Sequence, residues 1–376
     1  MAFALSGARV FDGETLQNGL AIVIDGTKIR EVVPLDKLGH QIEIRALNGG
    51  ILAPGFIDVQ VNGGGGALLN DNPTIDTVRR IAESHRRFGT TGMLPTVITD
   101  APGVLAQAIA SVKAARDEGI PGVLGIHIEG PFLDRDRKGA HDVCFIREMT
   151  ADDLRQIGNL DCGAVMLTLA PNRVSPIFIQ ELAGKNVLVS LGHSNATMVE
   201  IQLALNAGAR SFTHIFNAMS QLTGREPGMV GTALLDQNSY CGLIADGLHV
   251  HDAAMKVAIA VKPRYRMMLV SDAMPAAAGG PDIFELQGRT VRRENGRLIL
   301  DDGTLAGSNL TMDEAVRYCV TKLGVSLPDA LRMGSLNPAA FIRRDHEFGR
   351  IKPGYLASLV HMSDELNVLQ TWIDGK

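Results

Sequence analysis

The chain has 376 residues, 45% of them hydrophobic, so it can bury a large core and should form two domains or one barrel-sized domain with an appendage. The net charge of −5 and the scattered Lys and Arg residues argue against a basic face for nucleic acid. No apolar run reaches membrane-spanning length, the N-terminus lacks the basic start of a signal peptide, and the four cysteines form no CxxC pair. We therefore expect a cytoplasmic globular protein with reduced thiols, and neither nucleic acid nor a membrane as partner.

Both ends of the chain predict β structure. Strands are expected at residues 21–25, 28–33 and 42–47, and near the C-terminus at 357–361 and 368–373. Gly26 and Thr27 separate the first two strands and give a hairpin signal. The two ends are expected to pair in one small sheet, as a β-sandwich domain of residues 1–52 plus 346–376.

Between these ends, apolar runs alternate with helical patterns. Strands are expected at 54–60, 92–98, 123–128, 164–169, 187–191, 211–215, 241–245 and 267–270. Helices are expected at 74–88, 101–118, 151–157 and 252–261. Eight strands alternating with helices predict an α/β fold, a (β/α)8 TIM-like barrel over residues 53–345. The alternative, an open doubly wound sheet, would need a glycine-rich phosphate loop, and VNGGGG at 61–66 matches GxGxxG poorly.

After the eighth strand the chain makes an excursion, at about residues 276–308. Asn295 and Gly296 give a strong hairpin signal within it. Because the excursion leaves the carboxyl-end face of the predicted barrel, it could be a lid, and a decorative hairpin is an equally good reading. Helices are expected to resume at the capping box formed by Thr311 and Glu314, and again at 326–333.

Two histidines lie at or just past the ends of successive predicted strands. His193 follows the strand at 187–191, and His214 lies in the strand at 211–215. The segment between them predicts a helix, because Thr197 and Glu200 form a capping box. Parallel strands joined by a helix direct their carboxyl ends to the same side, so the two imidazoles should lie together and form half of a metal site. Two ordinary loop histidines are the plainer alternative.

Further polar residues occur at the ends of the other strands. They are Gln60 and Asn62 at strand one, Glu129 at strand three, His249 after strand seven and Asp272 at strand eight. In a barrel of this kind the functional residues lie at these ends. Glu129, His193 and His214 would form a set of two histidines and one carboxylate, which is common for catalytic zinc with an open position for water. Asp272 would take the proton of that water as general base and return it as acid, although a carboxylate here could also be a helix cap.

Motifs along essentially the whole chain resemble a known family. They are PGFIDVQVNG (54–63), GIHIEGPFL (125–133), KGAH (138–141), LGHSNAT (191–197), THIFNAM (213–219), GREPGMVG (224–231), ADGLHV (245–250) and SDAM (271–274). Taken together, they resemble the N-acetylglucosamine-6-phosphate deacetylase family of the amidohydrolase superfamily. The resemblance implies an enzyme of amino-sugar metabolism that hydrolyses the acetamide of N-acetyl-D-glucosamine 6-phosphate, giving D-glucosamine 6-phosphate and acetate.

The resemblance also assigns roles to individual residues. Glu129, His193 and His214 would bind the metal, and Asp272 would be the acid/base. His141 would orient or polarise the acetamide carbonyl, and His249 would contact the sugar. The phosphate would be held by Arg225 together with the backbone around Asn217 and Ala218. In the family that arginine reaches the partner subunit's site, so a homodimer is implied, and Arg is the natural bidentate partner of phosphate.

One position departs from much of the superfamily. Where a second metal would require two histidines at the end of strand one, the sequence has Gln60 and Asn62. Amides are poor zinc ligands beside imidazole, so we expect one tightly bound divalent ion per subunit and only a vestigial second position. Zinc is the first expectation, and Fe²⁺ or another divalent ion is compatible with the same ligands.

Two alternative functions stay open. The chain could be another amidohydrolase, such as a deaminase or a deacetylase for the galactosamine 6-phosphate epimer. It could also be a barrel that has lost catalysis and serves as a scaffold. The GREPG arginine and the FNAM segment favour a phosphosugar, and the presence of Glu129, His193, His214 and Asp272 together argues against a scaffold.

Overall fold

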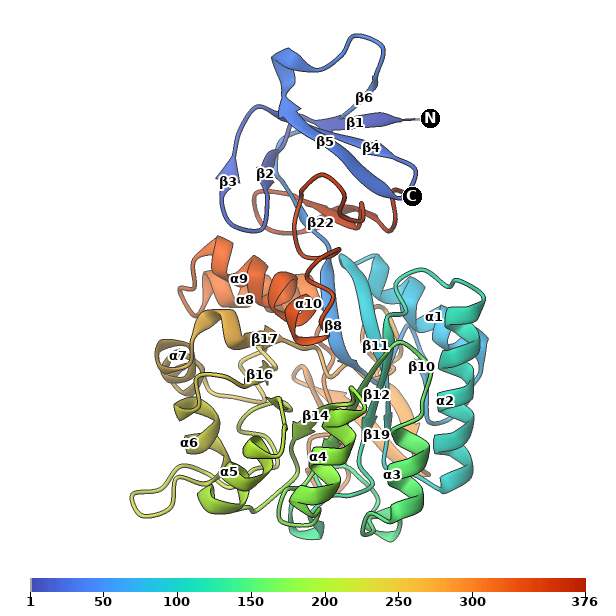
Figure 1. The fold of residues 1–376 in the computed structure, drawn as a ribbon, viewed down its shortest axis with the longest axis vertical. Coiled ribbons are helices and arrows are strands. Elements are labelled where there is room, and N and C mark those ends of the chain that lie inside the picture. Colours follow the sequence, from blue (N-terminus) through green and yellow to red (C-terminus); the bar gives the residue numbers. More distant parts are fainter. Residues whose placement is uncertain (1) are drawn as a thin grey trace.

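The computed structural model describes residues 2–376 and places a large barrel beside a smaller β domain that contains both chain termini (Figure 1). Eight strands form one parallel sheet, in the order of the sequence: β8 (Phe56–Val61), β11 (Thr90–Ile98), β12 (Gly125–Glu129), β13 (Ala164–Leu169), β14 (Leu188–Leu191), β15 (Ser211–Phe212), β16 (Tyr240–Leu243) and β17 (Met267–Leu269). The predicted (β/α)8 barrel is therefore confirmed, and the doubly wound alternative is wrong.

The barrel closes between its first and last strands. Just beyond β17, Ala273 forms a parallel bridge with Val61 at the end of β8. The N–H of Asp272 donates to the carbonyl of Gln60, with 3.0 Å between nitrogen and oxygen. This seam brings the ends of the first and eighth strands together, which places Gln60 and Asp272 at one site.

Helices surround the strands (Figure 1). They are α1 (Ile75–Arg86), α2 (Pro102–Asp117), α3 (Ala151–Ile157), α4 (Pro176–Gly184), α5 (Met198–Asn206), α6 (Gly228–Leu235), α7 (Asp252–Val261), α8 (Met312–Thr321), α9 (Leu327–Gly334) and α10 (Leu336–Phe341). The predicted capping boxes at Thr197 and Thr311 are both present. Sequence reasoning missed α4, α6 and α10. In α6 the reason is clear, because residues 228–234 are all buried and the segment has no polar face to create a helical period. No helix within residues 2–376 combines the length and the apolar character needed to cross a membrane.

The small domain contains two sheets rather than the single sheet expected. One has the order β5-β4-β1-β6, from Lys28–Pro34, Leu20–Asp25, Phe3–Ser6 and Glu43–Ala46. The other has the order β22-β21-β7-β2-β3, from Val368–Trp372, Leu359–Met362, Ile51–Pro54, Arg9–Phe11 and Leu16–Gln17. Side chains from both sheets, including Leu5, Ile22, Leu52 and Trp372, share one buried cluster. The composite β domain is confirmed, and the C-terminal strands join it through β7. The boundaries at residues 52 and 346 stay predictions.

The excursion after the eighth strand forms a three-stranded antiparallel sheet. Its strands are β18 (Ile283–Leu286), β19 (Arg289–Glu294) and β20 (Arg297–Leu300). Asn295 and Gly296 adopt φ values of 50° and 82°, the left-handed conformation that a tight hairpin turn requires. Leu286, Val291 and Leu298 pack with Leu68, which follows the first barrel strand, and with Ile98 at the end of β11. The hairpin thus covers part of the carboxyl-end face, beside a short ribbon of β9 (Gly63–Gly64) and β10 (Ala67–Leu68).

Candidate metal centre

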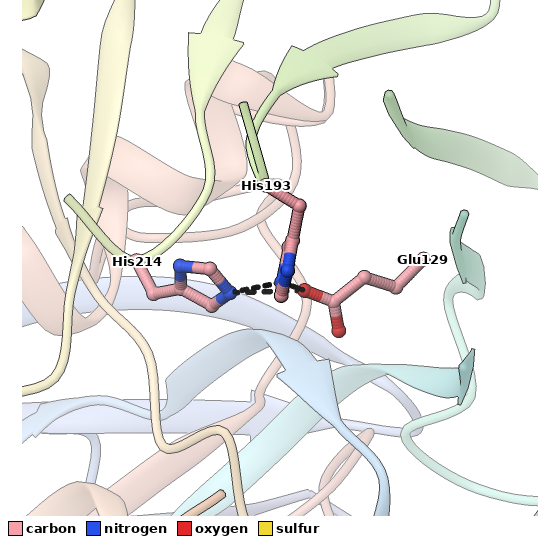
Figure 2. Close-up of side chains that lie close together, drawn as sticks. All are labelled: Glu129, His193 and His214. Carbon is pink, nitrogen blue, oxygen red and sulfur yellow. Dashed lines mark hydrogen bonds and ion pairs between the residues drawn. The ribbon is translucent and has the colours of Figure 1, made fainter. Parts of the chain in front are cut away.

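Glu129, His193 and His214 converge at the carboxyl end of the barrel, as expected (Figure 2). The Oε1 atom of Glu129 lies 3.2 Å from Nε2 of His193 and 3.0 Å from Nε2 of His214. The two Nε2 atoms are 3.1 Å apart. All three side chains are buried, so this group of two imidazoles and a carboxylate could hold a divalent metal ion.

The backbone at these positions adopts an unusual conformation. His193, His214 and Asp272 have φ values of +47°, +31° and +52°, in the left-handed region that residues other than glycine rarely enter. Each residue lies just past the end of a barrel strand, where the chain turns away from the sheet. Such conformations cost about 1–3 kcal/mol each and persist where the surrounding fold imposes them. Here the strained turns place the three side chains in the wall of one cavity.

The orientation of His193 is fixed by a backbone partner. Its Nδ1 lies 2.8 Å from the carbonyl oxygen of Arg137, which can only accept a hydrogen bond. The proton of the neutral ring is therefore on Nδ1, and Nε2 presents a lone pair toward Glu129 and His214. A metal-binding histidine usually has this arrangement, because the second nitrogen's hydrogen bond sets both the tautomer and the ring orientation.

Glu129 is held in its ionised form. Burial opposes the charge on this carboxyl, but the close contacts with His193 and His214 outweigh burial and hold its pKa well below the usual range. An ionised carboxylate beside two imidazole nitrogens has the charge and ligand types that suit a divalent transition metal. The donor set therefore fits the ion that the sequence predicts.

Asp272 lies beside this group and is positioned by two amides. Its Oδ1 accepts hydrogen bonds from Nδ2 of Asn62 at 2.7 Å and from Nε2 of Gln60 at 3.2 Å. The Gln60 amide also lies 3.3 Å from both oxygens of Glu129, so it bridges the two carboxylates. Burial and the nearby charge of Glu129 raise the pKa of Asp272 to about 6. In this arrangement both amides act as hydrogen-bond donors, and each donates to Asp272.

A cavity of about 360 Å³ opens over these residues. Of the predicted site residues, Asn62, Glu129, His141, His193, His214, Asn217, Ala218, His249 and Asp272 line it. The hairpin excursion contributes Leu286 and the segment from Thr304 to Gly307 to the same wall. The excursion is thus part of the cavity, which favours a role at the site over pure decoration.

Two further histidines differ in their relation to the cavity. His141 lies with its ring centroid 4.5 Å from that of His193, and burial lowers its pKa to about 3, so it is neutral. Its Nδ1 is buried and has no hydrogen-bond partner within residues 2–376. His127, in contrast, contacts Thr168 through Nε2 at 2.8 Å and Thr96 through Nδ1 at 3.2 Å. With both ring nitrogens in contact with threonine hydroxyls, His127 is a packed histidine and not a metal ligand.

Arg225 is the one predicted substrate-binding residue that does not line the cavity. It is exposed on the loop of residues 220–227, which precedes α6. An arginine that holds substrate phosphate within its own chain would be expected at the cavity wall. Its exposed position is compatible with a role in a neighbouring subunit.

Sequence reasoning missed two contributors to the site. The segment from Thr304 to Gly307 carries no residue type that signals chemistry, and only the path of the hairpin brings it to the cavity. Asp246 lies in the ADGLHV motif, yet its contact with His249, at 2.7 Å between Oδ2 and Nδ1, depends on the loop conformation. A carboxylate three residues before a candidate histidine was the available signal.

Comparisons with known proteins are consistent over the whole chain. Residues 51–376 match the amidohydrolase family, and residues 2–52 match the NagA composite domain. An N-acetylgalactosamine-6-phosphate deacetylase from Shewanella sp. (strain ANA-3) is 43% identical over 88% of this chain and 84% of its own length. An N-acetylglucosamine-6-phosphate deacetylase structure from Pasteurella multocida has a TM-score of 0.97 at 34% identity, and the match covers 100% of this chain and 99% of that one. A mutant of the Mycobacterium smegmatis enzyme of that name, in complex with N-acetyl-D-glucosamine-6-phosphate, has a TM-score of 0.92 at 27% identity, covering 100% and 98% of the two chains.

Proposed function

The chain belongs to the N-acetylglucosamine-6-phosphate deacetylase family of amidohydrolases, and from this premise we propose that it hydrolyses the acetamide of N-acetyl-D-glucosamine 6-phosphate to D-glucosamine 6-phosphate and acetate. The observation that carries the proposal is the convergence of Glu129, His193 and His214 with Asp272 in one cavity. A metal-dependent hydrolase needs this combination of an ion site and an adjacent proton acceptor.

Glu129, His193 and His214 would hold one divalent ion, and we propose zinc because two imidazoles and one carboxylate are a common catalytic zinc set. A divalent ion bound there would supply Lewis acidity, polarising the acetamide and lowering the pKa of water to about 7. Fe²⁺ is the main alternative, because imidazole and carboxylate ligands suit it as well.

Asp272 would transfer a proton during the reaction, and His141 would polarise the acetamide carbonyl. Asp272 lies between two amide donors and next to the metal ligands, so its free carboxylate oxygen can take a proton from the attacking water. The same group would return that proton to the sugar nitrogen as the C–N bond breaks. His141 is neutral, so it can donate one N–H to the acetamide oxygen without carrying a charge of its own.

The remaining residues would position the phosphosugar. Asn217 and Ala218 line the cavity, and Ala218 has a φ of +50° that turns the local backbone. His249 lines the same wall and would contact the sugar ring. Arg225 would hold the phosphate in the site of a partner subunit, which makes the active assembly a homodimer.

An acetate-release assay on purified, zinc-loaded protein tests the proposal. Four substrates are needed, namely N-acetylglucosamine and N-acetylgalactosamine, each with and without the 6-phosphate. We expect release from N-acetylglucosamine 6-phosphate that stops when the metal is chelated and returns when zinc is restored. Release that is unaffected by removing the metal, or that does not require the phosphate, would contradict the proposal.

The galactosamine 6-phosphate epimer is the second candidate substrate. The observation in its favour is the relative of that name, which is 43% identical, compared with 34% for the structure named for the glucosamine substrate. The two sugars differ only in the orientation of one ring hydroxyl, so the same metal chemistry would serve both. The ratio of kcat/KM for the two phosphorylated epimers in the same assay decides between them.

A further inference from the structure

His249 forms a buried pair with Asp246. Nδ1 of His249 lies 2.7 Å from Oδ2 of Asp246, and the two side chains are only 6% and 11% exposed. The other oxygen of Asp246, Oδ1, accepts the backbone N–H of Leu248 at 2.8 Å and that of His249 at 2.9 Å. Both oxygens of Asp246 therefore have a nitrogen partner. All of these partners belong to the loop after β16, so the carboxylate holds this loop together.

These contacts determine which nitrogen of His249 carries the proton. Burial opposes ionisation of Asp246, but the hydrogen bonds from His249 and the two backbone amides outweigh it and lower its pKa, so the carboxylate is charged and can only accept. Nδ1 must then donate, and in a neutral imidazole Nε2 is left as the acceptor. Nε2 is buried and has no hydrogen-bond partner in the described part of the chain, and His249 lines the cavity. A buried acceptor without a partner costs about 1–3 kcal/mol unless a ligand supplies the missing donor.

We propose that Asp246 is a positioning residue that fixes His249 with its proton on Nδ1, so that Nε2 accepts the hydrogen of a ring hydroxyl of the substrate. The inference rests on the proposed function, because it assumes that a sugar occupies the cavity. It extends that function by assigning Asp246 a role and His249 a direction of hydrogen bonding. A phosphosugar has hydroxyl donors around its ring, whereas an amide substrate without hydroxyl groups would leave Nε2 without a donor.

The change Asp246→Asn isolates this role because the shape of the side chain is kept. The backbone N–H groups of Leu248 and His249 require an oxygen at the Oδ1 position, so the amide oxygen should stay there. The amide NH₂ then replaces Oδ2 and faces Nδ1 of His249. Two donors cannot face each other, so the ring should change tautomer and carry its proton on Nε2. The matched control is Asp252→Asn, because Asp252 accepts from the hydroxyl of Tyr318, whereas the carboxylate bonded to His249 is that of Asp246.

Imidazole NMR of ¹⁵N-histidine-labelled, zinc-loaded protein tests the tautomer directly, with the His249 signals assigned by their loss in His249→Gln. We expect a protonated Nδ1 in the wild type and in Asp252→Asn, and a protonated Nε2 in Asp246→Asn. A protonated Nε2 in the wild type would overturn the proposal without any variant being made. This measurement needs no turnover, so its outcome is independent of whether the proposed reaction is correct.

Kinetics on substrate and on its 3-deoxy and 4-deoxy analogues test the consequence. In the wild type one of the two analogues should lose roughly tenfold in kcat/KM, the effect expected for a buried acceptor left without its donor. Asp246→Asn should reduce kcat/KM for the normal substrate about tenfold and remove that analogue's additional loss, whereas Asp252→Asn should keep it. An undiminished loss in Asp246→Asn would overturn the positioning role. If the wild type releases no acetate from either phosphorylated epimer, the proposed function fails, while the tautomer result still stands.

Discussion

At the scale of single residues, Asp272 lies where a proton acceptor is needed. Its neighbours fix the orientation of its carboxylate and raise its pKa. Two amides donate to its Oδ1, which leaves Oδ2 as the oxygen free for chemistry. Burial and Glu129 raise its pKa to about 6, which is closer to neutral pH than an ordinary aspartate. A base whose pKa lies near the working pH transfers protons in both directions most effectively.

Asp272→Asn tests this role. Asparagine keeps the size of the side chain but cannot accept the proton, so turnover should fall by at least ~10²-fold, the lower end for general acid–base catalysis. Metal content, measured by elemental analysis, should stay close to that of the wild type because the three ligands are unchanged. Near-normal turnover at full metal loading would exclude Asp272 as the acid/base.

The amides of Gln60 and Asn62 lead to a prediction of metal stoichiometry. Both donate to Asp272, and Gln60 also bridges to Glu129, so their hydrogen atoms point into the space where a second cation would lie. We expect one tightly held equivalent per chain after loading with modest excess zinc and dialysis. Two equivalents that both resist dialysis would contradict this expectation. Gln60→Ala offers a useful comparison, since removing this amide donor should not increase the number of bound zinc equivalents unless a second metal site is present.

The residues of the candidate site were largely predictable, for a physical reason. In a parallel barrel, every strand's carboxyl end lies at one face, so reading off the polar residues at these ends identifies the ligands without any coordinates. Asp246 escaped this procedure because its contact with His249 depends on the loop after β16. Arg225 shows another limit of sequence-based prediction, because the phosphate that it is proposed to hold lies in the site of another subunit.

At the scale of elements, the seam between the first and last barrel strands depends on a buried carboxyl. Asp58 on β8 is fully buried and accepts hydrogen bonds from the N–H of Gln60 at 3.1 Å and from the N–H of Ser271 at 3.3 Å. Ser271 immediately precedes Asp272, so Asp58 ties the start of the active-site turn to the first strand. Burial raises the pKa of Asp58 to about 7.

This raised pKa predicts a pH-dependent stability. The unfolded carboxyl ionises near its ordinary value of 3.8 and the folded one near 7, so between these values the folded protein holds a proton that the unfolded chain has lost. The contribution of Asp58 to the unfolding free energy should therefore fall as pH rises from about 4 to 7, by on the order of 4 kcal/mol. Asp58→Asn should flatten this part of the profile, because asparagine does not titrate.

Urea unfolding of chelator-treated protein at several pH values checks the prediction, since metal release would otherwise add its own pH dependence. Asp71→Asn serves as a matched control, because Asp71 is an aspartate whose side chain is exposed to solvent. If the wild type and Asp58→Asn lose stability in parallel between pH 4 and 7, Asp58 is ionised in the folded protein and the prediction is wrong.

The elements themselves were predictable where their pattern was periodic or capped. Helices α1, α5 and α8 begin at Thr74, Thr197 and Thr311, each of which precedes an amphipathic or capped segment. Helix α6 was missed because its residues 228–234 are all buried and give no helical period. The sequence predicted a β-sandwich, but not which strands belong to which of its two sheets, since strand patterns do not specify which strands pair across distant segments.

At the scale of the whole molecule, an exposed apolar surface lies next to Arg225. Val199 and Leu203 project from one side of α5 and are 70% and 51% exposed, and Leu222, in the same loop as Arg225, is 58% exposed. The loop is fixed against α5 by a hydrogen bond of 2.9 Å from the N–H of Met198 to Glu226. Exposed apolar side chains on neighbouring segments such as these are typical of a surface that another protein covers. We therefore expect this face to contribute to the proposed homodimer.

Arg225→Ala tests the contribution of the arginine to phosphate recognition. A charged hydrogen bond to phosphate is worth about 1.5–3 kcal/mol, so kcat/KM for the phosphorylated substrate should fall by roughly tenfold or more. Activity on the unphosphorylated sugar should change little, so the preference for the 6-phosphate should largely disappear. The control is Arg155→Ala, because Arg155 is another exposed arginine, which lies on α3 and pairs with Asp152. A preference for phosphate that survives in Arg225→Ala would show that another group, such as Arg137 at the cavity wall, holds the phosphate.

Mixed dimers separate action within a chain from action across the interface. An Arg225→Ala chain keeps its own metal ligands and Asp272 but supplies no arginine to its partner. An Asp272→Asn chain has no base but can supply an intact arginine. If Arg225 acts across the dimer, each mixed dimer contains one site with both a working base and a working arginine, while its other site has neither. Co-expression of the two variants with different affinity tags, followed by tandem purification of the mixed dimer, should therefore give about half of the wild-type activity per dimer. If both groups must come from one chain, no site in the mixed dimer is complete. Mixed dimers that form and have no more activity than the parent variants would place Arg225 in its own chain's site or in none.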